Sequence, residues 1–226
     1  MRGIFGVWAL ACGMFFTQNS SAMTIQEVID TLGDIAALEQ ICPMLIYSKD
    51  EAVPSSFVSK HEVSLDLVAS GPYYNDWKRA ERAAFERRFS NSIKHNCKEA
   101  LRLYGPAGTV HEGFFSSSGD NLSHYNNVTI QNFLDIMGDT FAVERICPAL
   151  VGENTAGQRF IEATGLLELN ESVRIKIGEG FEKATDLALT ARKSKSVKDN
   201  CDDGWRLYGP DGTKIPGLFT ARKSSN

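Results

Sequence analysis

Two pairs of aspartates, one pair in each half of the chain, are the side chains whose type and spacing could do chemistry. Asp30 and Asp34 lie four residues apart, and so do Asp135 and Asp139. At that spacing both carboxylates of a pair share one face of a helix. Paired carboxylates could bind a cation or act as general acid and base. The more ordinary interpretation is a solvated helix face.

An arginine-led octapeptide, Arg-Leu-Tyr-Gly-Pro-x-Gly-Thr, occurs twice, beginning at Arg102 and at Arg206. Either arginine could hold the aspartates of its own half, a contact that needs no ligand. Tyr104 and Tyr208 could line a groove, although a core position with a satisfied hydroxyl is the commoner role. The glycines and the proline predict a tight turn, leading into a short β segment.

Other catalytic and metal-binding motifs are missing from the sequence. None of the 4 histidines has a histidine at the matching place in the other copy. We find no H-E-x-x-H, G-x-S-x-G or phosphate-binding loop, and the cysteines are too far apart for C-x-x-C redox chemistry. We therefore assign no catalytic residue, no metal and no cofactor, and we favour a protein that is not an enzyme.

Helices must position these residues. Thr24 and Glu27 fit a capping box, and apolar residues then recur every three or four positions until Pro43. The same pattern begins again at Thr129. Residues 46–71 are loosely patterned and contain one candidate short helix. A long helical stretch follows in each copy, with a break expected near Ser90 and near Ser194 because serine and asparagine are weak helix formers.

The first 22 residues are typical of a secretory signal peptide. A basic start precedes a short apolar run, and small residues precede a cut after Ala22. A buried helix and lipoprotein processing at Cys12 are the alternatives. No second apolar run is long enough to span a bilayer, so we expect no membrane span in the mature chain.

Four cysteines remain after removal of the signal peptide, an even number that indicates disulfides in an exported protein. Each copy has one early and one late cysteine, at nearly equal separations. We therefore predict Cys42–Cys97 and Cys147–Cys201. Closing loops of this size contributes about 4 kcal/mol each in the chain-entropy model.

The predicted fold is mostly α, a tandem duplication of a small disulfide-stapled helical module that ends in a tight turn or short β segment. A net charge of −4 gives no case for nucleic acid or an anionic membrane surface. Locally basic stretches such as Arg87-Arg88 and Arg192-Lys193 are interpreted as solvated helix surface. The predicted organisation is a signal peptide (1–22), module one (23–115), a polar linker (116–127), module two (128–219) and a frayed tail (220–226).

These observations favour an exported, non-enzymatic binding or interaction protein, periplasmic or secreted, whose partner is a protein or an envelope component. The alternative is a hydrolase that acts on an envelope polymer through carboxylates such as Asp30 and Asp34. Carboxylates that pair with arginine and line no cleft would leave the hydrolase hypothesis without its residues.

Overall fold

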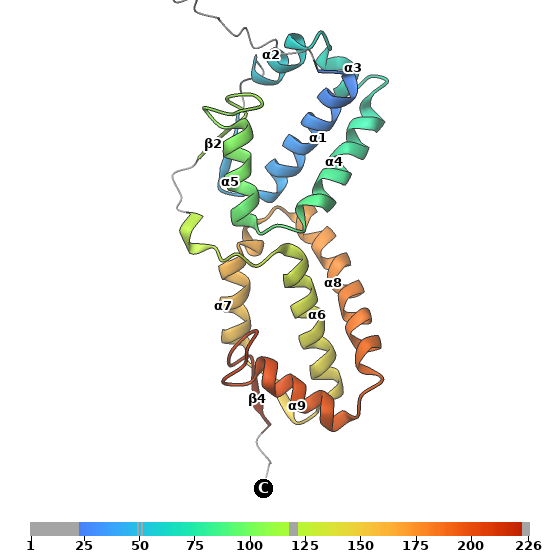
Figure 1. Cartoon of the computed structure of the whole chain (residues 1–226), viewed down its shortest axis with the longest axis vertical. Coiled ribbons are helices and arrows are strands. Elements are labelled where there is room, and N and C mark those ends of the chain that lie inside the picture. The colour runs from blue at the N-terminus through green and yellow to red at the C-terminus, as the bar shows by residue number, and fades with distance from the viewer. Residues whose placement is uncertain (1–22, 49, 51, 118–121, 223–226) are drawn as a thin grey trace, which may run out of the picture.

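The computed structural model describes residues 23–48, 50, 52–117 and 122–222, and these residues are mostly helical. Figure 1 shows an elongated molecule in which the first half of the chain (23–117) and the second half (122–222) follow each other along the longest axis. The predicted signal peptide, with Cys12, lies outside the described residues.

The first half is built around one central helix, α1, which packs against α4 and α5. Its strands form a two-stranded antiparallel sheet in which Leu45 pairs with Ser117 and Tyr47 with Phe115. Its elements are α1 (Ile25–Ile41), β1 (Leu45–Tyr47), α2 (Ala52–Lys60), α3 (Leu65–Ala69), α4 (Tyr74–Arg88), α5 (Ile93–Tyr104) and β2 (Phe115–Ser117).

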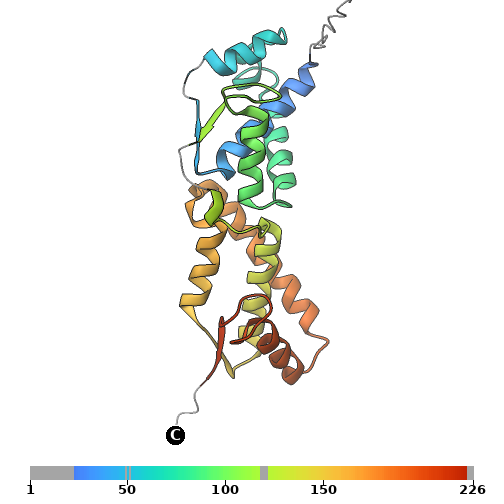
Figure 2. The same cartoon turned by 60° about the vertical axis from the view of Figure 1, so that its left-hand side comes forward.

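The second half places α6 against α8 and α9 in the same way. Its antiparallel sheet pairs Leu150 with Ala221 and Gly152 with Phe219. Figure 2 shows that each sheet lies on the side of its half that faces away from the long helix α4 or α8. The elements are α6 (Ile130–Ile146), β3 (Leu150–Gly152), α7 (Asn154–Thr164), α8 (Glu171–Arg192), α9 (Val197–Tyr208) and β4 (Phe219–Ala221), with short 3-10 turns η1 (Leu122–His124) and η2 (Leu166–Glu168).

Local signals determine where these helices begin and end. The predicted capping box at Thr24 is present, with both reciprocal hydrogen bonds to Glu27. The predicted breaks are confirmed, because Ser92 caps α5 and Ser196 caps α9 through their hydroxyls. The region 46–71 contains two helices, α2 and α3, where the sequence predicted one.

The two predicted disulfides are confirmed. Cys42 bonds to Cys97 and Cys147 to Cys201, with Cα–Cα separations of 5.3 and 5.4 Å. The early cysteine of each pair is the C-cap of its central helix. The late cysteine lies one turn or more inside α5 or α9. Each bond therefore fastens the end of α1 or α6 to the short helix beside it.

A glycine in each central helix allows a close helix crossing. A Cβ on Gly33 would lie 2.7 Å from the backbone of Ala80 in α4, and a Cβ on Gly138 would lie 2.6 Å from that of Ala184 in α8. Real Cβ atoms do not approach backbone this closely, so any larger residue would push the helices apart. The crossing brings the next residues, Asp34 and Asp139, next to the long helices.

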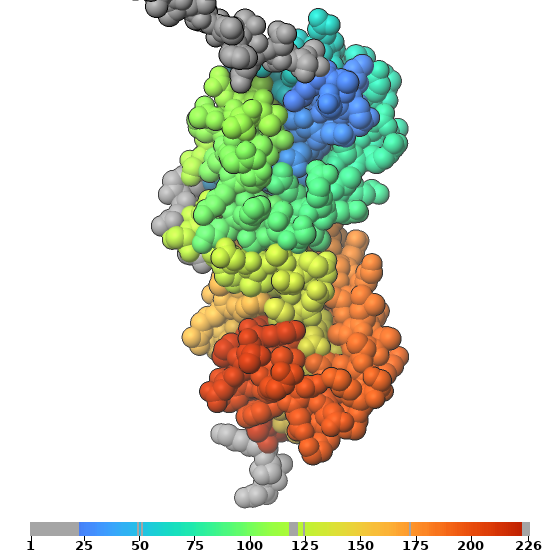
Figure 3. Space-filling view, in the orientation of Figure 1, coloured from blue at the N-terminus to red at the C-terminus, as the bar shows by residue number. Residues whose placement is uncertain are grey.

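An apolar core continues from the first half across the junction into the second, which also has a separate cluster of its own, and α6 begins against the first half. The amides of Ile130 and Gln131 donate to the carbonyls of Asn91 and Phe89, at 3.2 and 3.0 Å. The first amides of a helix have no partner within it. The turn between α4 and α5 therefore supplies acceptors that α6 needs. Figure 3 shows the halves packed end to end.

The surfaces that join the halves, the start of α6 and the turn between α4 and α5, differ in sequence from their counterparts at the outer ends of the molecule, the start of α1 and the turn between α8 and α9. At the free end of the first half, Glu27 completes the cap of α1, whereas Asn132 occupies the matching place in α6. At the joining turn Phe89 is half-buried, whereas the matching residue at the free end of the second half is the exposed Lys193.

The predicted linker and tail take part in the fold. Ser116 and Ser117 belong to β2, and Thr220 and Ala221 belong to β4. Tyr125 is only 2% exposed and its hydroxyl donates to Glu168. The Tyr125 ring packs in the core that continues across the junction. Residues 118–121 and 223–226 lie outside the described part.

We expect Gly33→Ala to lower the free energy of unfolding by about 1–3 kcal/mol, because the added methyl collides with the α4 backbone. Gly178→Ala in α8 is the matched control, since a Cβ there meets nothing within 4 Å. The control should raise stability by about 0.5–1 kcal/mol through helix propensity alone. Urea unfolding of both variants measures the difference, and equal effects would contradict the close crossing.

Candidate functional site

In the first half, the structure places Asp34 in a buried ion pair with Arg88 at the end of α4. The guanidinium binds both carboxylate oxygens, with Nε 3.1 Å from Oδ1 and Nη2 2.6 Å from Oδ2. The Tyr104 hydroxyl donates to Oδ2 at 3.1 Å. Asp34 and Arg88 are only 7% and 8% exposed. Three helices thus converge on one carboxylate.

The second half repeats this arrangement at Asp139. Arg192, at the end of α8, donates from Nε to Oδ1 at 2.7 Å and from Nη2 to Oδ2 at 2.9 Å. The Tyr208 hydroxyl donates to Oδ2 at 2.7 Å. The network therefore occurs twice, with the same residue types on the same elements.

An asparagine holds the arginine-bearing turn in each half. The Asn96 side-chain amide donates to the Arg88 carbonyl at 3.0 Å, and the Asn200 amide donates to the Arg192 carbonyl at 3.1 Å. Both asparagines are almost fully buried. They satisfy the last carbonyl of the long helix, so the turn that carries each arginine is fixed.

Burial and hydrogen bonding together set the protonation states of the two tyrosines and of Asp139 in these networks. Burial, together with the neighbouring carboxylate, raises the pKa of Tyr104 and of Tyr208 far above the ordinary value. Both hydroxyls thus stay protonated and act as donors. Burial opposes ionisation of Asp139, but hydrogen bonds from Arg192 and Tyr208 outweigh it and lower the pKa of this carboxyl.

The duplicated arginines of the octapeptide do not hold the aspartates. Arg102 instead makes two hydrogen bonds to Glu99, at 2.8 and 2.6 Å, and Arg206 bonds to Asp203 at 3.2 Å. Each arginine has its partner three residues earlier on its own helix, and each is exposed. The prediction of an aspartate contact was wrong because this helix face points to water.

Asp30 and Asp135 do not join their neighbours in a shared site. Each is exposed and accepts a hydrogen bond from the glutamine one turn earlier, Gln26 or Gln131, at 2.9 Å. The buried network draws Asp34 and Asp139 inward, while Asp30 and Asp135 stay at the surface. Among the predicted candidates, the structure brings together Asp34 with Tyr104 and Asp139 with Tyr208.

Arg88 and Arg192 are the two residues of the networks that sequence reasoning missed. They were interpreted as solvated surface because lysines and other arginines surround them in the sequence. Each lies the same number of residues before the late cysteine of its half. Repetition alone could not have identified them as buried, because Arg102 and Arg206 also recur in register and are exposed.

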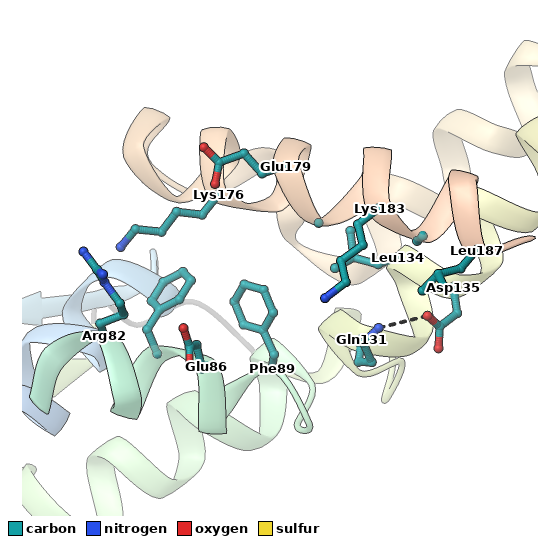
Figure 4. A pocket seen from close by; sticks show the side chains of 13 residues that line it. Arg82, Glu86, Phe89, Gln131, Leu134, Asp135, Lys176, Glu179, Lys183 and Leu187 are labelled. Atoms are coloured by element: carbon teal, nitrogen blue, oxygen red, sulfur yellow. Dashed lines mark hydrogen bonds between the residues drawn. The ribbon is translucent and has the colours of Figure 1, made fainter. Parts of the chain in front are cut away.

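A cleft of about 870 Å³ opens where the two halves meet. Its floor is apolar, with Phe85, Phe89 and Leu134 contributed by α4, its following turn and α6. Figure 4 shows α8 along one side, with the tips of Lys176 and Arg82 at one end of the cleft. Charged residues from both halves surround the floor: Arg82, Glu86, Asp135, Lys176, Glu179 and Lys183.

Ring contacts shape the floor of this cleft. The rings of Phe85 and Phe89 lie 4.9 Å apart, and the Lys176 ammonium lies 4.3 Å above the Phe85 ring. An ammonium above an aromatic face is an attractive contact. It joins α8 of the second half to α4 of the first. Asp135 is the sole member of the predicted candidates among the residues that line the cleft.

Other kinds of site are not found in the part of the chain that the structure describes. Within residues 23–48, 50, 52–117 and 122–222, no group of three or more His, Cys, Asp or Glu side chains is placed to hold a metal ion. In the same ranges, no helix has the length and apolar character needed to cross a membrane.

Comparisons with protein-family models, with curated proteins and with solved structures find no match for this chain.

Replacing the buried arginine should cost far more than replacing the octapeptide arginine. We expect Arg88→Met to lower the free energy of unfolding by about 3 kcal/mol, because the buried Asp34 would lose its bidentate partner and keep only the more distant Arg87 guanidinium, 3.5 Å from Oδ1. Arg102→Met, at an exposed pair, should leave the free energy of unfolding nearly unchanged. Denaturant unfolding at neutral pH measures both. Similar losses in the two variants would refute a structural role for the buried pair.

Acid should weaken the second network. The pKa of Asp139 is lower in the folded state than in the unfolded chain. The ionised carboxylate therefore contributes fully to the free energy of unfolding above the unfolded-state pKa of about 4. That contribution to stability is lost as pH falls through the folded-state pKa. We expect Asp139→Asn to be less stable than wild type at pH 7, with the gap closing below about pH 4. Asp135→Asn, at the surface, is the control and should show no such closing gap.

Proposed function

We propose that this chain is an exported, non-enzymatic binding protein, built by tandem duplication of a disulfide-stapled helical module that ends in a tight turn and a short β-strand. Its ligand site is the cleft at the junction of the halves. The observation that carries the proposal is the cleft's anatomy, an apolar aromatic floor with a charged rim drawn from both halves. Protein interaction sites have this anatomy.

The chemistry of the rim favours a polypeptide ligand. Three cationic and three carboxylate side chains surround the floor, so neither a simple anion nor a simple cation is favoured. A segment that places an apolar side chain against the half-buried Phe89, with charges of both signs beside it, satisfies floor and rim together. The partner we propose is a protein of the cell envelope or the extracellular space.

Export is supported by the two disulfides, since disulfides persist in oxidising compartments. The buried networks support a binding role over a hydrolytic one. Asp34 and Asp139 are engaged with arginine and tyrosine and do not line the cleft, while Asp30 and Asp135 lie apart from them at the surface. The duplicated aspartates therefore do not form a pair of carboxylates that faces one substrate.

The test is capture by the intact chain of a partner from the envelope fraction, followed by direct binding of the purified partner. Arg82→Glu combined with Lys183→Glu reverses two rim charges and should weaken binding at least tenfold. Arg79→Glu combined with Lys198→Glu is the matched control, because both side chains are highly exposed and neither lines the cleft. Equal binding by both double variants would refute the cleft as the site. Turnover of an envelope polymer that is lost in Asp30→Ala would favour the hydrolase instead.

A further inference from the structure

The two disulfides differ in exposure, although they occupy matching places in the two halves. Cys42, Cys97 and Cys147 are each at most 1% exposed. Cys201, the late cysteine of the second half, is partly exposed. A thiol attacks a disulfide only at a sulfur that it can reach, so access helps to set the rate of exchange. The second disulfide therefore has one cysteine open to solvent, whereas the first has none.

The helix face that carries Cys201 is exposed on both sides of the cysteine. Val197 and Trp205, one turn before and one turn after Cys201 on α9, are 59% and 42% exposed. Residues four apart on a helix share one face. Figure 1 shows α9 at the outer end of the second half, away from the junction. An external molecule can thus approach Cys201 along an open apolar strip of α9.

The matching face of α5 is covered. Ile93, which corresponds to the exposed valine of α9, is buried, and so is Cys97 one turn later. The chain that enters the second half lies against the first turn of α5, where the Lys94 ammonium donates to the Tyr125 carbonyl at 3.2 Å. The chain at the junction thus helps to shield the first disulfide.

Contacts other than the disulfide hold α9 in place. Near its start, the Asn200 side-chain amide donates to the Arg192 carbonyl at 3.1 Å. At its end, the Tyr208 hydroxyl donates to Asp139 on α6 at 2.7 Å. Opening the second disulfide would leave these contacts intact, so the two sulfurs would stay near each other. The bond can therefore open and close again without unfolding of the second half.

We propose that Cys147–Cys201 is a redox-active disulfide that exchanges with an external dithiol, while Cys42–Cys97 is structural. The attacking thiolate forms a bond to the Cys201 sulfur and breaks the bond to Cys147, whose sulfur takes up a proton. The second thiol of the reductant then displaces Cys201 and closes the reductant's own disulfide. Two electrons and two protons pass from the dithiol to the protein. This site is separate from the junction cleft and does not depend on it.

The test is partial reduction of the intact, oxidised chain by dithiothreitol, with free thiols blocked by N-ethylmaleimide at intervals and located by peptide mapping. We expect Cys147 and Cys201 to be labelled at least tenfold faster than Cys42 and Cys97, with the helical circular dichroism retained. Oxidised glutathione should then restore the second disulfide. A rate difference of less than tenfold, the reverse order, or loss of helical structure on reduction of the second pair would overturn the proposal.

Paired variants distinguish direct attack from reduction after local unfolding. Trp205→Lys and Trp205→Glu both remove the ring and place opposite charges one turn from Cys201. The reductant thiolate is an anion, so direct attack should be about two- to fivefold faster in the lysine variant than in the glutamate variant. Near the end of a helix, lysine stabilises and glutamate destabilises, so reduction through local opening would follow the reverse order. The reverse order, or equal rates, would refute attack at Cys201.

Discussion

The buried pairing of one aspartate with one arginine, made once in each half, is the constraint on which the rest of the structure depends. Removing two charges from water is costly unless they meet in good geometry with every remaining hydrogen bond satisfied. That requirement fixes three helices at once: Asp34 lies on α1, Arg88 at the end of α4, and Tyr104 at the end of α5. Gly33 makes the meeting feasible, because it lets the two long helices approach closely. The disulfide between Cys42 and Cys97 then fastens the end of α1 to α5.

Features with local causes could be predicted from the sequence. The cap at Thr24, the stop before Pro43 and the breaks before Ser92 and Ser196 follow from neighbouring residues. The cysteine pairing followed from the repeat of the spacing. The partner of Asp34 could not be derived in that way, since it depends on how α4 crosses α1. Hydrophobic periodicity gives the face of a helix but not the position along the neighbouring helix at which it crosses.

The junction cleft depends on how the two halves meet, not on the residues that they share. The junction cleft exists because α6 begins against the turn after α4, which places the aromatic floor between two sets of charges. A repeat in the sequence directs attention to its shared residues, which here stabilise the fold. The residues that line the junction cleft lie outside the shared networks of aspartate, arginine and tyrosine.

The two ends of the molecule also have a consequence for self-association. The halves meet head to tail, and such a contact has no symmetry that closes it, so a matching surface at both free ends would allow chains to add without limit. Here one free end completes its own helix cap with Glu27, and the other carries Lys193 where the joining turn carries Phe89. Repeating the contact would put a lysine ammonium at the place of the half-buried Phe89, where a charge is unfavourable. The two outer ends therefore do not reproduce the pair of surfaces that joins the halves.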